Sequence, residues 1–554
     1  MAVFQPKFAL RRDFSATTLH RGSFSAEPAG LTHSPSEGNL MASLSTVAAR
    51  NVHCRGIGLL VVAMIFCGTL GWQRQAVAQL QQGGLQQGGL QGGGLQQGGL
   101  QGGGLQQGGL QGGLQGGLQG GGNNGNQAGG SGVVVDPQGV LRVLAMPDAN
   151  LSRVRRRAAA AAMPGDLRQP SKFRKVALSR LEAALVQAIE SGEPLPDSLK
   201  NLAGLTRIQY VFIYPATAEQ PGDVVLAGPA EPWVDDAFGR PIGVETATPV
   251  VQLEDLAAVL RAFPPGQPAD LLVGCSIDPT QEGLANMQAY LKNVGLVNPQ
   301  GTQAEIVSGL REALGPQVVT IDGISPSTHY AQVLVEADYR MKLIGIGLEK
   351  PPVRMSTWID LTSAGSVAAN ALQRWYFTPN YECLRVTEDD LGIELVGEGV
   401  KLLGADEMVM PDGRRMSSQS SSRASKLFTQ AFTLKYEQIA SRHPVYAQLK
   451  TLIDLAIVAA YLQEHDAFGR TNWSADILRD ESSYAIEQYT PPRQIDCAVN
   501  AVRKGNRLLT PIGGGVVMTP RRALDAANLQ ADEQGTVAAT KSELTIPADR
   551  WWWD

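Results

Sequence analysis

The stretch SPSTHYAQVLVEADYRMKLIGIG, residues 325–347, carries the clearest structural signal in this 554-residue chain. Ser325 suits a helix N-cap because its hydroxyl can accept a free backbone N–H, and Pro326 suits the first helical position. Residues 343–347 are an apolar run closed by glycines, which predicts a strand or a helix exit into the core. Between Pro326 and residue 343, four apolar side chains at helical spacing predict one buried stripe: Tyr330, Leu334, Ala337 and Met341.

The charged side chains of this stretch form two pairs at a spacing of four, Glu336 with Arg340 and Asp338 with Lys342. In both pairs the acid precedes the base, which is the favourable orientation on an exposed helix. Glu336, Asp338, Tyr339 and Arg340 could instead form a polar site. Charge pairs are more often a solvated face, so we expect Glu336 and Arg340 to pair on the exposed side.

Strand-forming and helix-forming runs alternate around this stretch, which favours an α/β fold, with a mixed α+β arrangement as the alternative. The predicted strands are 133–135, 140–144, 207–214, 223–227, 270–277 and 317–321. The predicted helices are 171–191, capped by Ser171, and 253–263, 280–294 and 304–314. A strand-rich region follows at 355–361, 374–386 and 392–403, and then two long helices at 426–440 and 446–462. The second of these helices is apolar almost all round and should be buried.

The chain is predicted to have five parts. These are a signal-peptide region (1–78, with Met41 as the expected true start), a low-complexity disordered linker (79–132), an α/β and strand-rich body (133–415), a helical C-terminal part (426–530) and a loose tail (531–554). The tail ends in three tryptophans, Trp551 to Trp553, and the sequence does not decide whether they dock in a groove or stay exposed.

An export signal is indicated near the N-terminus. Residues 56–73 carry no charge, follow Arg50 and Arg55, and precede the small-residue site Ala76-Val77-Ala78. This pattern is typical of a cleaved secretory signal peptide. A membrane anchor is the alternative, but a spanning helix needs about 20 mainly apolar residues and this run is broken by glycines. We therefore expect a periplasmic or extracellular protein with no permanent membrane span after cleavage.

The linker contains leucine at every fifth position from Leu80 to Leu110, in a background of glutamine and glycine. A period of five makes no stripe on a helix and alternates faces on a strand. Glycine also adds entropy that a fixed backbone must lose. The composition therefore favours a flexible tether, and a pentapeptide β-helix with inward leucines is the alternative.

The charge balance bears on possible partners. Residues 79–554 carry 40 basic and 49 acidic residues, a net charge of −9, which argues against a general nucleic-acid binder. A basic stretch runs from Arg153 to Arg180, with Asp166 as its one acidic residue. It could bind an anionic surface polymer, but a solvated helix end is the commoner meaning of a charge run.

Catalytic and metal-binding patterns are weak. Cys275, Cys383 and Cys497 follow the signal and allow one disulfide, but they are too widely spaced for a metal knuckle. The run Gly274 to Asp278 approaches a nucleophile elbow and lacks its second glycine. His329, His443 and His465 show no ligand spacing, and the glycine runs 345–347 and 513–515 lack the remaining residues of a nucleotide loop. We predict no catalytic, metal or cofactor-binding residue and no cofactor.

Five segments form a further pattern: DVVLAGPAEPW (223–233), SIDPTQEGL (276–284), VEADYRMKLIGIG (335–347), RWYFTPNYE (374–382) and HPVYAQLKTLIDLAIVAA (443–460). Together they resemble an uncharacterised domain, a domain of unknown function, in exported planctomycete proteins, over about residues 170–510. The resemblance implies a bacterial envelope or extracellular setting. It brings no known activity, cofactor or catalytic residue.

These observations favour an exported, non-enzymatic envelope or interaction protein of unknown activity. Its expected partner is another envelope protein or an anionic surface polymer, and not nucleic acid. The alternative is an exported hydrolase that uses Cys275 or Ser276 as nucleophile with His329 as base.

Overall fold

The computed structural model describes residues 130–145, 153–266, 271–297, 303–363, 371–412, 414–417, 421–486, 488–500, 502–504, 507–509 and 513–554. The predicted signal peptide and all but the last three residues of the predicted linker lie outside the described residues.

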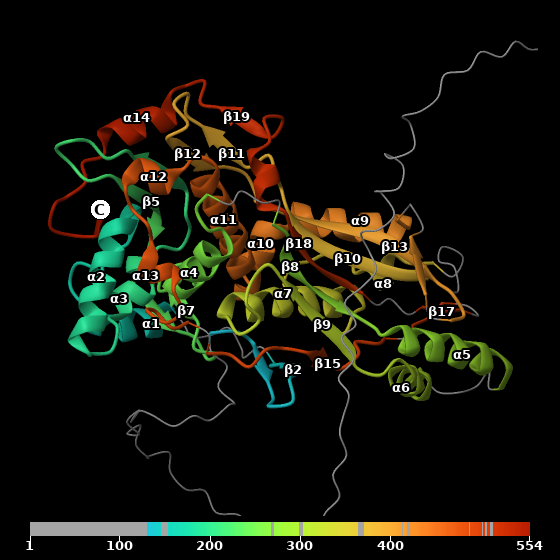
Figure 1. Cartoon of the computed structure of the whole chain (residues 1–554). Coiled ribbons are helices and arrows are strands. Elements are labelled where there is room, and N and C mark those ends of the chain that lie inside the picture. The colour runs from blue at the N-terminus through green and yellow to red at the C-terminus, as the bar shows by residue number, and fades with distance from the viewer. Residues whose placement is uncertain are drawn as a thin grey trace, which may run out of the picture. The chain divides into compact units, whose positions relative to one another are not determined.

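The larger sheet has nine strands and is mixed, with β8 near its centre (Figure 1). Its order is β1 (Val133–Val135), β2 (Val140–Val143), β15 (Gln494–Ile495), β9 (Gln317–Asp322), β8 (Val273–Asp278), β18 (Gly514–Met518), β10 (Ala371–Pro379), β13 (Val400–Val409) and β14 (Arg415–Ser417). The β2–β15 and β18–β10 pairs are parallel and the other neighbours are antiparallel. Strands from the predicted body and from the predicted C-terminal part therefore share one sheet.

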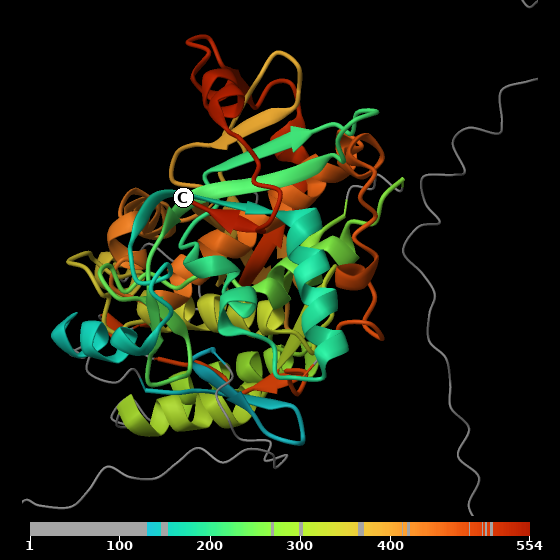
Figure 2. The same ribbon diagram turned by 90° about the vertical axis from the view of Figure 1, so that its left-hand side faces the viewer.

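The second sheet has seven strands, and the C-terminal strand lies at one of its edges. Its order is β19 (Leu529–Ala531), β11 (Leu384–Val386), β12 (Gly392–Leu395), β4 (Tyr210–Tyr214), β5 (Asp223–Ala230), β3 (Ser171–Ala177) and β20 (Trp552–Trp553). In Figure 2 the red C-terminal strand lies next to the teal and green strands of this sheet. Two short ribbons complete the described strands: β6 (Trp233–Asp235) with β7 (Pro241–Gly243), and β16 (Val502–Lys504) with β17 (Arg507–Leu509).

Helices pack against both sheets and between them. They are α1 (Arg153–Ala159), α2 (Leu178–Ser191), α3 (Asp197–Lys200), α4 (Leu253–Ala262), α5 (Gln281–Val297), α6 (Gln303–Leu314), α7 (His329–Gly345), α8 (Trp358–Leu361), α9 (Arg423–Leu434), α10 (Tyr436–Ala440), α11 (Pro444–Glu464), α12 (Ala467–Thr471), α13 (Asp476–Arg479) and α14 (Thr536–Glu543). Helix α7 packs on β8 and β18 of the larger sheet, and α11 packs on α7, α4, α10 and α12 (Figure 1).

Helix α11 is the central core helix. Its length and apolar composition would suffice to cross a membrane, but 89% of its most apolar window is buried inside the structure. Its apolar surface is buried against other helices, as the sequence predicted for residues 446–462. The fold class, a mixture of α and β elements, is also confirmed.

The local predictions were wrong at three places. Residues 171–177 form strand β3, not the start of a helix, because β5 and β20 pair with them on either side. Residues 358–361 form the helix α8, where Thr357 and Asp360 make a reciprocal capping box. Thr328, not Ser325, caps α7, since its hydroxyl accepts from the backbone N–H of Ala331.

The C-terminal residues differ from the loose tail predicted for 531–554. They contain α14 and then β20, which is antiparallel to β3. Arg174 donates to both carboxylate oxygens of Asp554 at 2.8 Å, and its guanidinium lies over the Trp552 ring. Two of the terminal tryptophans therefore take part in a sheet edge, through partners that are almost 400 residues away in sequence.

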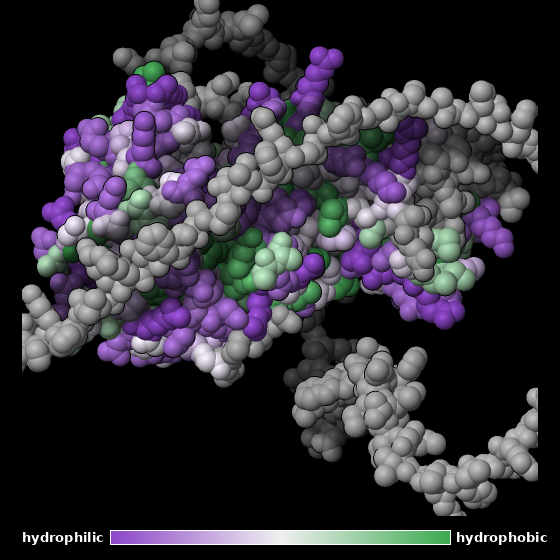
Figure 3. All heavy atoms as spheres, turned by 90° about the horizontal axis from the view of Figure 1, so that it is seen from above, coloured by the Kyte–Doolittle hydropathy of each residue, from purple (hydrophilic) through white to green (hydrophobic). Residues whose placement is uncertain are grey.

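The surface is mainly hydrophilic on the face seen from above, with a small hydrophobic group near its middle (Figure 3). Among the described residues the most exposed large apolar side chains are Leu434 and Val154, at 75% and 74%. Scattered apolar residues of this kind are normal for a protein surface and do not by themselves mark a binding face.

Candidate functional site

Helix α7 is buried around its whole circumference, and this overturns the exposed face predicted for its charged pairs. Every residue of α7 except Leu343 is buried, and the Glu336 side chain is fully buried. The predicted pairs do form, with Arg340 Nε 2.7 Å from Glu336 Oε1 and Lys342 Nζ 2.8 Å from Asp338 Oδ2. They lie inside the protein because other polar groups complete them there.

Glu336 is the centre of the first buried network. Arg240, also fully buried, donates from Nη2 to both carboxylate oxygens, at 2.9 and 2.7 Å. Burial alone would raise the pKa of Glu336, but the charges of Arg240 and Arg340 outweigh it and lower this pKa to about 2. The carboxylate therefore stays ionised and fully paired, which is the condition under which a buried charge is tolerated.

The last residues of the predicted linker enter the same network. The backbone N–H of Gly132 donates to Glu336 Oε2 at 2.7 Å. A Cβ at position 132 would lie 2.2 Å from Glu336 Oε1 and 2.7 Å from Arg240 Nη2, so this approach requires glycine. We call residues Gly130–Gly132 and the α7 groups that hold them the linker clamp.

His329, the first residue of α7, makes the other half of the linker clamp. Its Nδ1 lies 3.0 Å from both carboxylate oxygens of Asp255, and its Nε2 lies 3.2 Å from the carbonyl oxygen of Gly130. Gln448 of α11 donates to the same carbonyl at 3.1 Å. Burial lowers the pKa of His329, but Asp255 and Glu254 raise it to about 9, so both ring nitrogens donate as an imidazolium.

Asp338 and Lys342 form a second buried network against the centre of the larger sheet. Lys342 Nζ also donates to the carbonyl oxygen of Ile277 in β8 at 3.0 Å. Burial raises the pKa of Asp338, and the charge of Lys342 lowers it by a smaller amount. The result is a pKa of about 6. Asp338 Oδ1 is buried without a hydrogen-bond partner among the described residues. The Asp338 side chain is fully enclosed, so it reaches no substrate in this arrangement.

A pocket of about 760 Å³ opens beside the C-terminal half of α7. It lies between β2, β15 and the turn from α10 to α11. Figure 1 labels β2 and β15 below α7. Arg340 lines the pocket and connects it to the first network, because its Nη1 donates to Glu349 Oε2 at 3.0 Å. We call this the β2–α7 pocket.

The hydrolase residues are not arranged for catalysis. Cys275 and Ser276 lie inside β8, which pairs with β9 and β18, so the turn of a nucleophile elbow is missing. The Cys275 thiol is 2% exposed, and burial raises its pKa well above the usual value. The described hydrogen bonds of His329 go to Asp255 and Gly130 and not to β8.

The basic stretch and the three cysteines, the remaining candidates from the sequence, are engaged in ion pairs or buried in the core. Arg153 and Arg157 of the basic stretch pair with Glu245 at the rim of a pocket of about 680 Å³. Within the described ranges all three cysteines are free and buried, so the disulfide that the sequence allowed is not formed. The same ranges hold no cluster of three or more His, Cys, Asp or Glu residues suited to a metal ion.

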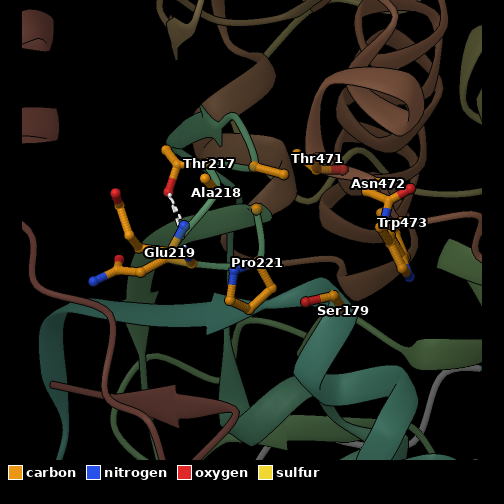
Figure 4. Close-up of a pocket in the computed structure, with 11 residues that line it drawn as sticks. Ser179, Thr217, Ala218, Glu219, Pro221, Thr471, Asn472 and Trp473 are labelled. Atoms are coloured by element: carbon orange, nitrogen blue, oxygen red, sulfur yellow. Dashed lines mark hydrogen bonds between the residues drawn. The ribbon is translucent and has the colours of Figure 1, made fainter.

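Another pocket, of about 370 Å³, lies between the β4–β5 loop and α12 (Figure 4). Its loop holds its own shape, since Thr217 Oγ1 accepts from the backbone N–H groups of Glu219 and Gln220. The indole of Trp473 donates to Glu182 at 2.6 Å and is thus committed to the core. Charged side chains do not converge on this pocket, so the β2–α7 pocket is the stronger candidate.

The sequence pairs Glu336 with Arg340, although on an exposed face, and offers His329 only as the base of the alternative hydrolase. It does not indicate their partners in the structure, which are Arg240, Asp255, Glu349, His443 and Gly132. No local signal marks these partners, because they lie on separate loops and helices. Gly132 directly precedes the valines 133–135, but this order alone does not show that a side chain at position 132 would collide with Glu336.

The comparisons with known proteins add a family of unknown function. The family model described as "Protein of unknown function (DUF1598)" matches residues 275–358, which include most of β8 and all of α5, α6, β9 and α7. This match supports an uncharacterised domain family for that part of the chain. Searches of curated proteins and of solved structures return no match.

Proposed function

We propose that this chain is an exported, non-enzymatic interaction protein, whose leucine–glutamine–glycine linker begins at Gln79 after cleavage and tethers the folded body to another envelope protein. Export is supported by the apolar run and the Ala76-Val77-Ala78 site. The observation that carries the proposal is the linker clamp, because it joins the end of the linker to the most buried charges of the body.

The clamp is built to resist detachment. Gly130 is held through its carbonyl by His329 and Gln448, and Gly132 is held through its N–H by Glu336. Each of these bonds is buried, and two of them involve a charged partner, the stronger class of hydrogen bond.

An interaction role is favoured over hydrolysis by the state of the candidate nucleophiles. Cys275 is buried with a raised pKa, so little thiolate is available at neutral pH. A thiol-reactive or serine-reactive probe applied to the folded protein should therefore leave Cys275 and Ser276 unlabelled. Labelling of either residue without unfolding would overturn the non-enzymatic assignment.

Limited proteolysis tests the clamp directly. Thermolysin cuts before apolar residues, and between Leu118 and Val133 the chain offers it almost none. In the parent protein the protected fragment should begin near Leu118. In Gly132→Ala the new methyl displaces Glu336, so the cut should move to Val133 or Leu141.

Gly165→Ala is the matched control, because a Cβ at position 165 meets nothing within 4 Å. Its fragment should begin at the same residue as that of the parent. An unchanged fragment in Gly132→Ala would contradict the clamp. N-terminal sequencing of the exported protein tests the other half of the proposal and should start at Gln79.

A further inference from the structure

The β2–α7 pocket has the size and the walls of a small-molecule site. Its volume of about 760 Å³ falls within the range of about 300–1,000 Å³ that is usual for ligand pockets. One wall is apolar, formed by Leu141, Val143, Leu343, Pro352 and Ile495. Leu141 and Ile495 are each 1% exposed, so this wall is a continuation of the core and not a loose surface.

The lining of the pocket also contains basic residues. Arg142, Lys350 and Arg442 line the pocket and are exposed, and none of them pairs with a carboxylate in the described part of the chain. Two acidic residues also line it. Glu349 is already engaged by Arg340, and Asp496 is exposed at the rim. The pocket therefore retains uncompensated positive charge next to an apolar wall.

His443 provides an independent sign that a polar partner is missing. Its side chain is 6% exposed and lines the pocket. Its Nδ1 is buried without a hydrogen-bond partner among the described residues, and its Nε2 lies 3.4 Å from Glu349 Oε1, which is too long for a strong bond. An unsatisfied buried nitrogen is unfavourable, so a ligand group that satisfied it would gain affinity.

We propose that the β2–α7 pocket binds a monocarboxylate with an apolar chain. The carboxylate lies among His443, Arg442 and Lys350, and the chain lies along the partly exposed Val143, Leu343 and Pro352. A carboxylate accepts several hydrogen bonds from charged donors, and an extended apolar chain matches the dry wall. This inference rests on the pocket alone and does not depend on the linker clamp.

Calorimetric titration of the purified full chain with three probes tests each part of the proposal. Decanoate carries both the carboxylate and the chain, decanol keeps only the chain, and acetate keeps only the carboxylate. We expect decanoate to bind at one site, and decanol and acetate to bind at least about tenfold more weakly, because each forfeits one wall. Equal affinity for decanol, or no binding of decanoate, would overturn the proposal.

Single substitutions then locate the site. Arg442→Gln and Lys350→Gln should each weaken decanoate binding about tenfold, the effect expected for loss of one charge-assisted contact. Arg155→Gln removes an exposed arginine that does not line the pocket and should leave the affinity unchanged. Thermal melts that match the parent show that the variants are folded. Decanoate binding that is insensitive to both pocket variants would place the ligand elsewhere and contradict the assignment.

Discussion

Helices α7 and α11 are in contact and are both buried all round, yet they are buried for different reasons. Helix α11 is mostly apolar, so its own sequence determines where it lies. Helix α7 carries four charged residues at 336–342, which pair with one another inside the helix and are completed by groups from distant segments. Arg240 is 96 residues away from Glu336 and Gly132 is 204 residues away. The interior position of a charged helix is thus a property of the whole fold.

The largest effect should come from breaking the charge network of α7. Glu336→Gln keeps the shape of the side chain and removes the negative charge, which leaves Arg240 and Arg340 buried without it. We expect the free energy of unfolding to fall by about 3–5 kcal/mol in denaturant titrations.

An exposed pair provides the control for that substitution. Asp197→Asn disrupts the surface pair with Lys200 and should cost less than about 1 kcal/mol. A similarly small loss in Glu336→Gln would mean that Glu336 faces solvent, as its spacing alone suggested.

A cavity in α11 should cost somewhat less. Leu452 is 1% exposed, and Leu452→Ala should lower the free energy of unfolding by about 2–5 kcal/mol through lost packing. Leu434 of α9 is 75% exposed, so Leu434→Ala should change it by less than about 0.5 kcal/mol. If Leu452→Ala were as mild as Leu434→Ala in the same titration, α11 would not be the core helix.

The two helices should also differ in their response to pH. His329 of α7 has its pKa raised from 6.5 to about 9, so the folded protein keeps a proton that the unfolded chain loses. The stabilisation is complete below pH 6.5 and is lost as the pH rises through about 9. Glu254, whose pKa is raised by burial, reinforces this trend at lower pH.

Unfolding measured from pH 6 to 10 checks this dependence. The parent should lose stability steadily up to about pH 9. His329→Gln should be less stable than the parent at pH 6 and should lack the loss that the parent shows as the pH rises toward 9, while the part due to Glu254 near pH 7 remains. A parent profile that rises toward pH 9 would show that the imidazolium is not stabilised by Asp255. The Leu452→Ala profile should run parallel to that of the parent, because no titrating group is removed.

The same contrast explains what could be predicted from the sequence. Periodicity located α4, α5, α6 and α11 and most of the strands, because each of these elements follows from its own residues. It also placed Glu336 four residues from Arg340. It could not place Arg240, His443 or Gly132 beside them, since contacts between distant segments leave no local pattern. The helix predicted for residues 171–177 is wrong for the same reason, because the strands that pair with β3, β5 and β20, come from other parts of the chain.

The smallest change in the free energy of unfolding should come from Asp554, a carboxylate that also pairs with a buried arginine but is itself partly exposed. Asp554 accepts two hydrogen bonds from Arg174, which is as fully buried as Arg240, but the Asp554 side chain is 43% exposed. Water can therefore compensate much of the lost charge, and Asp554→Asn should cost less than about 1 kcal/mol in the same denaturant titrations. Its amide oxygen can still accept one of the two bonds. A loss equal to that of Glu336→Gln would mean that the buried arginine alone sets the cost. A small loss would show that Glu336→Gln costs more than Asp554→Asn because the Glu336 carboxylate is buried. Burial of the carboxylate is the property that distinguishes the charges of α7 from those at the surface.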